Sequence, residues 1–219
     1  MARLALVMLL AGSAAFAAPE TPRVALPLMK SAPAIDGAIG EAEWAGAARV
    51  VGVVGRSGLL ADREADFRVG CDGRRLLLAM RSETPPGDEI LVRAVKDDAR
   101  DILAAFHDDS IELWIDPHRG KAAGDRRYFQ IITNARGALF DRSYDPTNQA
   151  NAVDVGWRVQ WEFANKVVDG WWHVEMAIPL ESLGAQNDLD HPWGLRIGRN
   201  WQRPGEQTRW ESVNTAFDD

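Results

Sequence analysis

Two acidic residues, Glu112 and Glu175, stand out because each interrupts a strongly apolar, alternating stretch of the sequence. Alternation with a period of two places both carboxylates on the polar face of a strand. Glycoside hydrolysis would need two carboxylates facing each other across a sugar. The chain holds 32 Asp and Glu residues, however, so some pair will satisfy any spacing. Glu112 and Glu175 therefore indicate solvated strand residues or ligand-binding groups rather than a catalytic pair.

Other chemistries lack their usual motifs. The sequence has no G-x-S-x-G for an activated serine, and its four histidines (His107, His118, His173 and His191) lack the H-E-x-x-H spacing of a zinc site. A haem iron held between a methionine and a histidine is an alternative, because Met80, Met176 and His173 all fall on predicted strands. Met80 and Met176 lie on apolar faces, which favours core packing. Cys71, the single cysteine, is predicted to be a buried thiol.

Sugar recognition would use aromatic rings, which stack on the C–H face of a pyranose, and polar side chains, which bind its hydroxyl groups. Trp supplies nine of the eighteen aromatic residues. Groups of both kinds occur on the polar faces of the predicted strands: Glu112, Trp114, Gln130, Arg158, Gln160 and Trp171. A second cluster, which could supply oxygen ligands to calcium or form an ordinary solvated loop, contains Asp97, Asp98, Asp101, Asp108 and Asp109.

The elements that must position these residues are strands. Alternating apolar and polar residues predict strands over 67–71, 76–80, 111–116, 129–133, 157–163, 172–178 and 193–198, with turns at Asp72-Gly73 and Asp169-Gly170. Helix is scarce: 179–183 could form one turn, and 88–106 is an insertion of uncertain structure. Many short strands joined by turn residues predict an all-β fold, an antiparallel β-sandwich of the jelly-roll or DOMON-like kind.

The first seventeen residues read as a secretory signal peptide. A positive start at Arg3, an apolar run and the small-x-small sequence Ala15-Phe16-Ala17 predict cleavage after Ala17 and a secreted or periplasmic protein. Residues 18–33 read as a linker or first strand, and 34–219 as the sandwich. The formal net charge of −7 argues against nucleic acid or an anionic membrane surface as a partner, and no stretch is long enough for membrane insertion.

The order of several motifs resembles the family 9 carbohydrate-binding module and its DOMON-like relatives. The resemblance rests on Ile35-Asp36-Gly37, the stretch from Glu41 to Trp44, the run from Asp108 to Pro117, Tyr128-Phe129-Gln130, the strand from Gly170 to Pro179, and Trp193 to Ile197. Each motif is degenerate alone, but together they span residues 33 to about 217 in the family's order.

The resemblance implies a β-sandwich, often with structural calcium and without an organic cofactor, that binds oligosaccharide or polysaccharide without catalysis. In the family a sugar lies between two tryptophans. Glu112 matches the family's sugar-bonding Glu, and Gln130 falls where the family uses an Arg. Asn214 resembles an Asn of the last loop, Phe106 and Phe217 occupy the two tryptophan positions, and Trp201 is a substitute stacking platform.

Three functions follow as expectations. The first is a secreted carbohydrate-binding domain, alone or as a module of a glycoside hydrolase in carbohydrate catabolism. The others are a DOMON-like haem domain for electron transfer and a structural or adhesion sandwich without a small ligand. Family members end with another strand after the loop that holds Asn214 and Phe217, so we expect either a fragment of a longer protein, truncated at its C-terminal end, or a sandwich with an open edge.

Overall fold

A computed structural model describes residues 23–87, 89–95, 107–119, 124–148, 150–186, 189–203 and 205–210. The predicted signal peptide lies outside these residues, as do Phe106, Asn214 and Phe217. Among the described residues, no helix has the length and apolar character needed to cross a membrane.

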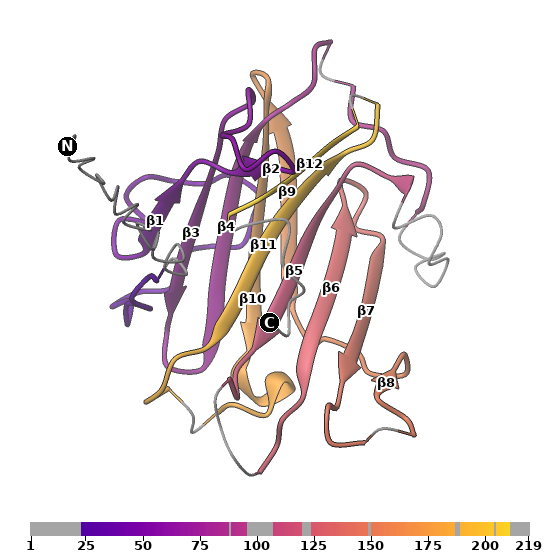
Figure 1. The fold of residues 1–219 in the computed structure, drawn as a ribbon. Coiled ribbons are helices and arrows are strands. Elements are labelled where there is room, and N and C mark those ends of the chain that lie inside the picture. Colours follow the sequence, from indigo (N-terminus) through magenta and orange to yellow (C-terminus); the bar gives the residue numbers. More distant parts are fainter. Residues whose placement is uncertain are drawn as a thin grey trace, which may run out of the picture.

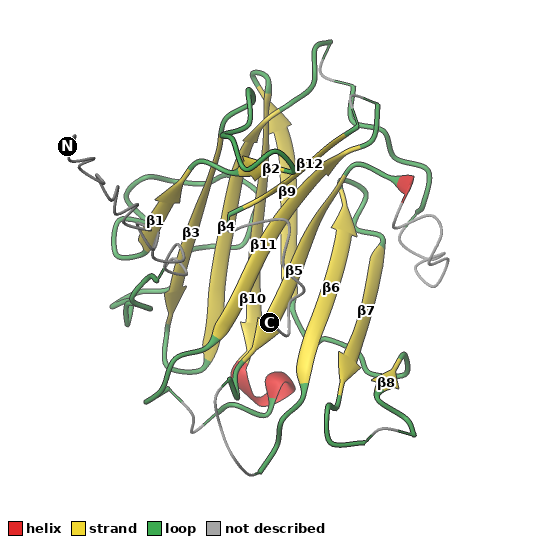
Figure 2. Ribbon diagram, viewed as in Figure 1, coloured by secondary structure: helices red, strands yellow, loops and turns green. Residues whose placement is uncertain are grey.

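The chain folds as two antiparallel β-sheets that pack face to face (Figures 1 and 2). The five-stranded sheet has the order β1-β3-β4-β10-β9 and the seven-stranded sheet the order β2-β12-β11-β5-β6-β7-β8. The predicted all-β sandwich is therefore confirmed. The strands are β1 (Ala48–Val51), β2 (Val54–Gly55), β3 (Ala65–Cys71), β4 (Arg75–Glu83), β5 (Ser110–Asp116), β6 (Tyr128–Asn134), β7 (Leu139–Tyr144), β8 (Val153–Asp154), β9 (Glu162–Val168), β10 (Trp171–Pro179), β11 (Gly194–Trp201) and β12 (Glu206–Arg209).

The inner faces of the sheets form one apolar core, as the alternation predicts. Met80 and Met176 are buried there, and Cys71 is a buried free thiol. His173 is adjacent to Val174 on β10 and so points to the opposite side of the sheet from Met176. These three side chains cannot hold one haem iron between them, so this candidate ligand set for the haem alternative is wrong.

Two local predictions differ from the structure. The hairpin at Asp72-Gly73 is confirmed, with the Asp72 carboxylate accepting the backbone N–H of Arg74 and Arg75. The strand predicted over 157–163 instead runs from Glu162 to Val168 as β9. The preceding residues, including Val159, pack against the core but form no strand. The Val159 N–H donates to the Asp141 carboxylate at 2.7 Å rather than to a neighbouring strand.

The N-terminal segment covers the outer face of the five-stranded sheet through Glu175. This residue was expected to be solvated or to bind a ligand, but it is 0% exposed. Its Oε2 accepts the backbone N–H of Asp36 at 3.1 Å and of Gly37 at 2.8 Å, and its Oε1 accepts the indole N–H of Trp44 at 2.7 Å. The expectation is corrected: Glu175 fastens the residues around Asp36 and Trp44 to the sheet.

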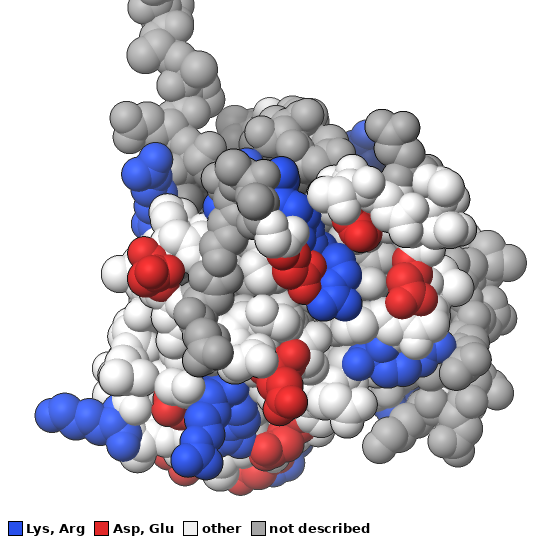
Figure 3. Space-filling view, turned by 90° about the horizontal axis from the view of Figure 1, so that it is seen from below, with Lys and Arg blue, Asp and Glu red and all other residues white. Residues whose placement is uncertain are grey.

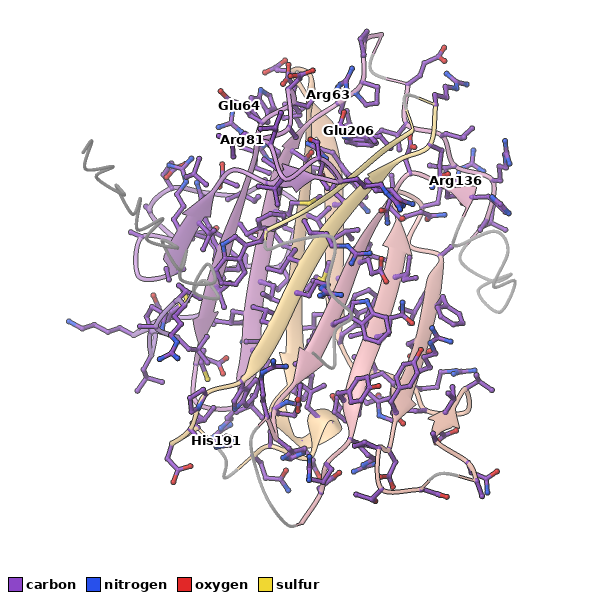
Figure 4. All side chains as sticks on the ribbon, in the orientation of Figure 1. Arg63, Glu64, Arg81, Arg136, His191 and Glu206 are labelled. Atoms are coloured by element: carbon purple, nitrogen blue, oxygen red, sulfur yellow. The ribbon has the colours of Figure 1, made fainter. Side chains whose placement is uncertain are left out.

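A buried guanidinium joins the two sheets near the upper end of the sandwich. Arg199 of β11 donates to the hydroxyl of Ser82 on β4 at 3.0 Å and pairs with Glu206, which also binds Arg63 (Figure 4). Burial lowers the pKa of Arg199 to about 10, so the group stays charged at neutral pH. At the lower end, side chains of both signs are interspersed over the visible surface (Figure 3).

Candidate functional site

The outer face of the seven-stranded sheet aligns polar and aromatic residues from four neighbouring strands. The register places Trp114 of β5 opposite Arg196 of β11 and Gln130 of β6, and Gln130 opposite Arg142 of β7. Glu112 lies two residues before Trp114 and so shares its face. We call the set Glu112, Trp114, Gln130, Arg142 and Tyr144 the sheet-face site.

Hydrogen bonds link the polar members of the sheet-face site in a chain. Glu112 Oε1 accepts from Gln130 Nε2 at 2.6 Å and from the indole N–H of Trp114 at 2.7 Å. Gln130 Oε1 in turn accepts from Arg142 Nε at 2.6 Å. In the described part of the chain, Glu112 Oε2 and the two terminal NH₂ groups of Arg142 form no hydrogen bond. The network therefore keeps one charged acceptor and one charged donor group for a ligand.

Aromatic rings flank this network. Tyr144 lies 5.4 Å from Trp114 and is stacked on Tyr128 at 4.8 Å between ring centroids. The Arg142 guanidinium sits 4.7 Å above the centre of the Tyr144 ring, which fixes its plane. Burial raises the pKa of Tyr144, so its hydroxyl stays protonated at neutral pH and can donate a hydrogen bond.

Chemically, the sheet-face site suits a polyhydroxylated ligand. A carboxylate oxygen accepts hydroxyl protons, a guanidinium donates to hydroxyl oxygens, and partly exposed aromatic rings take C–H faces. Glu112 and Trp114 are both half-buried, so each retains contact with solvent. The arrangement favours binding through several weak, directed contacts.

The structure brings together two of the predicted site residues, Glu112 and Gln130, from adjacent strands. Trp201, predicted as a stacking platform, is only 1% exposed and packs against Trp172 in the core. That prediction is corrected, because a ring buried between the sheets offers no face to a sugar. Phe106, Asn214 and Phe217 lie outside the described residues.

Arg142 and Tyr144 were not predicted as site residues, because β7 was not predicted as a strand. A signal was present: after the turn at Asn134–Gly137, the residues Phe140, Arg142 and Tyr144 alternate with Asp141 and Ser143. The inward position of Asp141 hides this pattern, because a charged residue there breaks the apolar face. The inward-facing Asp141 carboxylate is stabilised by hydrogen bonds from the Arg158 guanidinium and the Val159 backbone N–H.

The described members of the acidic cluster do not fit a calcium site. The Asp108 carboxylate accepts the backbone N–H of Arg93 and Ala94 and the amide of Asn134. Asp109 accepts the backbone N–H of Leu91 and Gln202. Every oxygen of both carboxylates is thus used, and no group of three or more metal-ligating side chains occurs among the described residues. Asp97, Asp98 and Asp101 lie outside those residues.

Calcium binding itself stays a prediction of the family resemblance. A cation that binds only the folded chain raises the melting temperature with its concentration. We therefore expect melting at a higher temperature in calcium chloride than in EGTA, measured by circular dichroism. Identical melting curves in the two buffers would show that calcium does not stabilise the folded protein.

Comparison with known proteins supports the architecture. No family model and no curated protein matches the sequence. A family 9 carbohydrate-binding module from Caldicellulosiruptor kristjanssonii, solved with glucose, superposes with a TM-score of 0.55 at 14% identity, over 87% of this chain and 91% of that one. The same organism's family 9 module with cellotriose gives 0.52 at 15%, over 83% and 85%. A Bacteroides uniformis protein provisionally assigned to carbohydrate binding gives 0.54 at 17%, over 90% and 93%. The chain therefore has a fold like that of family 9 carbohydrate-binding modules.

Proposed function

We propose that this protein is a non-catalytic carbohydrate-binding domain that binds an oligosaccharide or polysaccharide at the sheet-face site. The observation that carries the proposal is the chain of hydrogen bonds from Glu112 through Gln130 to Arg142. It leaves a free carboxylate oxygen and a free guanidinium edge beside the rings of Trp114 and Tyr144. The similar folds of proteins solved with glucose and cellotriose support the same class of ligand.

Arg142 supplies the guanidinium that the family resemblance places at Gln130. The two residues are directly opposite each other on β6 and β7, and Gln130 holds Arg142 by its Nε. Moving the cation to the neighbouring strand shifts it by about 4.8 Å, the spacing between strands. We infer that the ligand binds one carboxylate and one guanidinium, as in the family, but with a different spacing between them. The preferred sugar therefore need not be that of a family member.

Binding is tested with a panel of xylo-, cello- and manno-oligosaccharides by isothermal titration calorimetry. The proposal expects saturable binding to at least one of them, with no release of new reducing ends on long incubation. Steady hydrolysis that Glu112→Gln abolishes would make the protein a glycosidase. An absence of binding to a broad glycan array would favour the structural or adhesion sandwich.

Replacement of Arg142 by Met is expected to weaken binding of the best oligosaccharide about tenfold. Methionine keeps apolar contact with Phe140 and Tyr144 but removes the donor groups, and a hydrogen bond to a charged group contributes about 1.5–3 kcal/mol. The measurement is calorimetry on the wild type and the variant. Arg136→Gln is the matched control, since Arg136 is exposed at the β6–β7 turn (Figure 4). Equal losses in both variants would indicate a general effect of charge.

The predicted signal peptide and the family resemblance also support a setting for this binding. We propose that the chain acts outside the cytoplasm, in carbohydrate catabolism, beside an enzyme that hydrolyses glycosidic bonds. Detection of the mature N-terminus at Ala18 in an exported fraction would support the first part. Retention of the uncleaved chain inside the cell would contradict it.

A further inference from the structure

The outer face of the five-stranded sheet carries a second polar row, on the opposite layer from the sheet-face site. The register aligns Asp66 of β3 with Arg81 of β4, Arg81 with His173 of β10, and His173 with Lys166 of β9. Residues in register on adjacent strands point to the same face of a sheet, about 4.8 Å apart. The row therefore presents three basic side chains side by side next to one carboxylate.

The three basic side chains have unused hydrogen-bonding capacity. Among the described residues, Arg81, His173 and Lys166 form no hydrogen bond and no ion pair. Arg81 is held by stacking alone, with its guanidinium 3.9 Å above the centre of the Trp171 ring. Stacking fixes the plane of the group and leaves its N–H edge open to a ligand.

Two buried atoms beside the row also lack partners. Arg68 Nη1, a donor, and Asp66 Oδ1, an acceptor, have no hydrogen bond, although the two side chains are only 3% and 7% exposed. Of the two, only Arg68 Nη1 can bind an oxyanion. Buried polar atoms of this kind are rare in native proteins unless a water or a ligand satisfies them. Arg68 lies two residues after Asp66 on β3 and so has the same outward direction.

Several carboxylates near the row have partners of their own, whereas two of its cations form no ion pair. Asp66 is neutralised by Arg49 at 3.0 Å and Arg68 at 3.7 Å, and Arg68 also binds Glu41 at 2.5 Å. Two further carboxylates lie nearby and accept backbone N–H groups: Glu175 from the N-terminal segment and Glu83, by Oε2, from Glu64. Among the described residues, Arg81 and Lys166 form no ion pair, although the charge of Arg81 also acts on the nearby Glu41 and lowers its pKa. Burial and the charge of Arg81 lower the pKa of His173, so its imidazole is neutral at pH 7.

We propose that Arg81, His173 and Lys166, with Arg68 Nη1 beside them, form a site for a small oxyanion, either the carboxylate of an acidic sugar or a sulfate group. A guanidinium edge binds two oxygens of such a group in parallel, and the imidazole and ammonium supply further donors. This oxyanion site is distinct from the sheet-face site and does not depend on it.

The test follows the imidazole signals of the whole protein by nuclear magnetic resonance during titration with sodium sulfate, against sodium chloride at equal ionic strength. We expect saturable shifts of the His173 signals, assigned with His173→Gln, and a rise in the His173 pKa, because a bound anion favours the imidazolium. His191, at the lower end of the sandwich, should not move (Figure 4). Equal responses to sulfate and chloride would overturn the proposal.

Two variants make the result specific. Arg81→Gln should weaken sulfate binding about tenfold, whereas Arg136→Gln, at an exposed position on the other sheet, should leave it unchanged. Lys166→Gln is a second variant at an exposed position, where the core cannot be disturbed, and should weaken binding less. Sulfate binding that is insensitive to both Arg81→Gln and Lys166→Gln would refute the assignment.

Digalacturonate separates the two sources of the oxyanion. Competition between digalacturonate and sulfate for the His173 signals would identify an acidic sugar as a ligand, and sulfate binding alone would identify sulfate. If digalacturonate binds only through Arg142 and sulfate does not bind, the oxyanion site is wrong while the sheet-face site stands. Loss of neutral-sugar binding would leave the oxyanion site untouched.

Discussion

Replacement of Glu175 by Gln is expected to lower the free energy of unfolding by about 3 kcal/mol. The carboxylate accepts three N–H groups, from Asp36, Gly37 and Trp44, and is wholly buried. Glutamine has one acceptor oxygen, and its NH₂ group would face N–H donors. At least one of the three buried N–H groups then loses its acceptor, and it faces the NH₂ group of the glutamine, which is also a donor. For a chain of this size the loss corresponds to a fall in melting temperature of roughly 6–12 °C.

Urea unfolding should be followed both by tryptophan fluorescence and by far-ultraviolet circular dichroism. Glu162→Gln is the matched control, because Glu162 lies on the neighbouring strand β9, has a side chain that is 62% exposed, and pairs with Arg75 at the surface. We expect that control to change stability by less than about 0.5 kcal/mol. If fluorescence changes before circular dichroism in Glu175→Gln, the segment around Trp44 detaches before the sheets unfold.

Equal stability of Glu175→Gln and wild type would mean that the N-terminal segment adds nothing to the fold. Glu175 lies on the opposite sheet from the sheet-face site, so below the melting transition the variant should bind sugar as the wild type does. A loss of sugar binding without a loss of stability would place the ligand on the five-stranded sheet instead.

Most of the sandwich could be predicted from the sequence because a period of two is a local property. In β5 and β10 every second residue is apolar and faces the core, so strand type and inward face both follow from a few neighbours. Turn residues such as Asp72-Gly73 then limit the strands. The strand predicted over 157–163 was wrong for most of its length. Burial alternates along these residues, but before Glu162 no neighbouring strand pairs with them.

The two notable acids show why a polar face is not enough to predict a role. Glu112 and Glu175 occur in the same sequence pattern, and both point away from the core. Glu175 is nevertheless buried, because a segment about 130 residues earlier, around Trp44, folds over its sheet. Whether an outward-facing residue is exposed to solvent depends on whether a segment far away in the sequence packs over it. The alternation within one strand carries no information about that.

Only part of the sheet-face site was predicted from the sequence. Glu112 and Gln130 were expected on a shared face because each alternates with core residues on its own strand. Arg142 could not be paired with Gln130 without knowing that β7 follows β6 in register. Trp201 was misplaced because aromatic residues are equally suited to cores and to ligand faces, and the inward direction of Trp201 decides for the core.

Replacement of Glu112 by Gln is expected to weaken the best oligosaccharide at least tenfold. Glutamine oxygen can still accept from Trp114 and Gln130, so the local fold is kept. The free Oε2, however, becomes an NH₂ group that donates where the ligand hydroxyl also donates. A charge-assisted hydrogen bond contributes about 1.5–3 kcal/mol, and 1.4 kcal/mol is a factor of ten in affinity. Calorimetry on wild type, Glu112→Gln and the control Glu162→Gln measures the change.

The pairing of Glu112 with Arg142 gives this prediction a stricter form. Both bind the same ligand in the proposal, and Gln130 connects them, so removal of either group should disturb the other. In a double-mutant cycle, Glu112→Gln with Arg142→Met should therefore cost less than the sum of the single losses, by about 0.5 kcal/mol or more. Additive losses would mean two independent contacts. If affinity and stability are both unchanged in Glu112→Gln, the residue is an ordinary solvated strand residue, since an exposed charge contributes at most about 1 kcal/mol, and the sugar binds elsewhere.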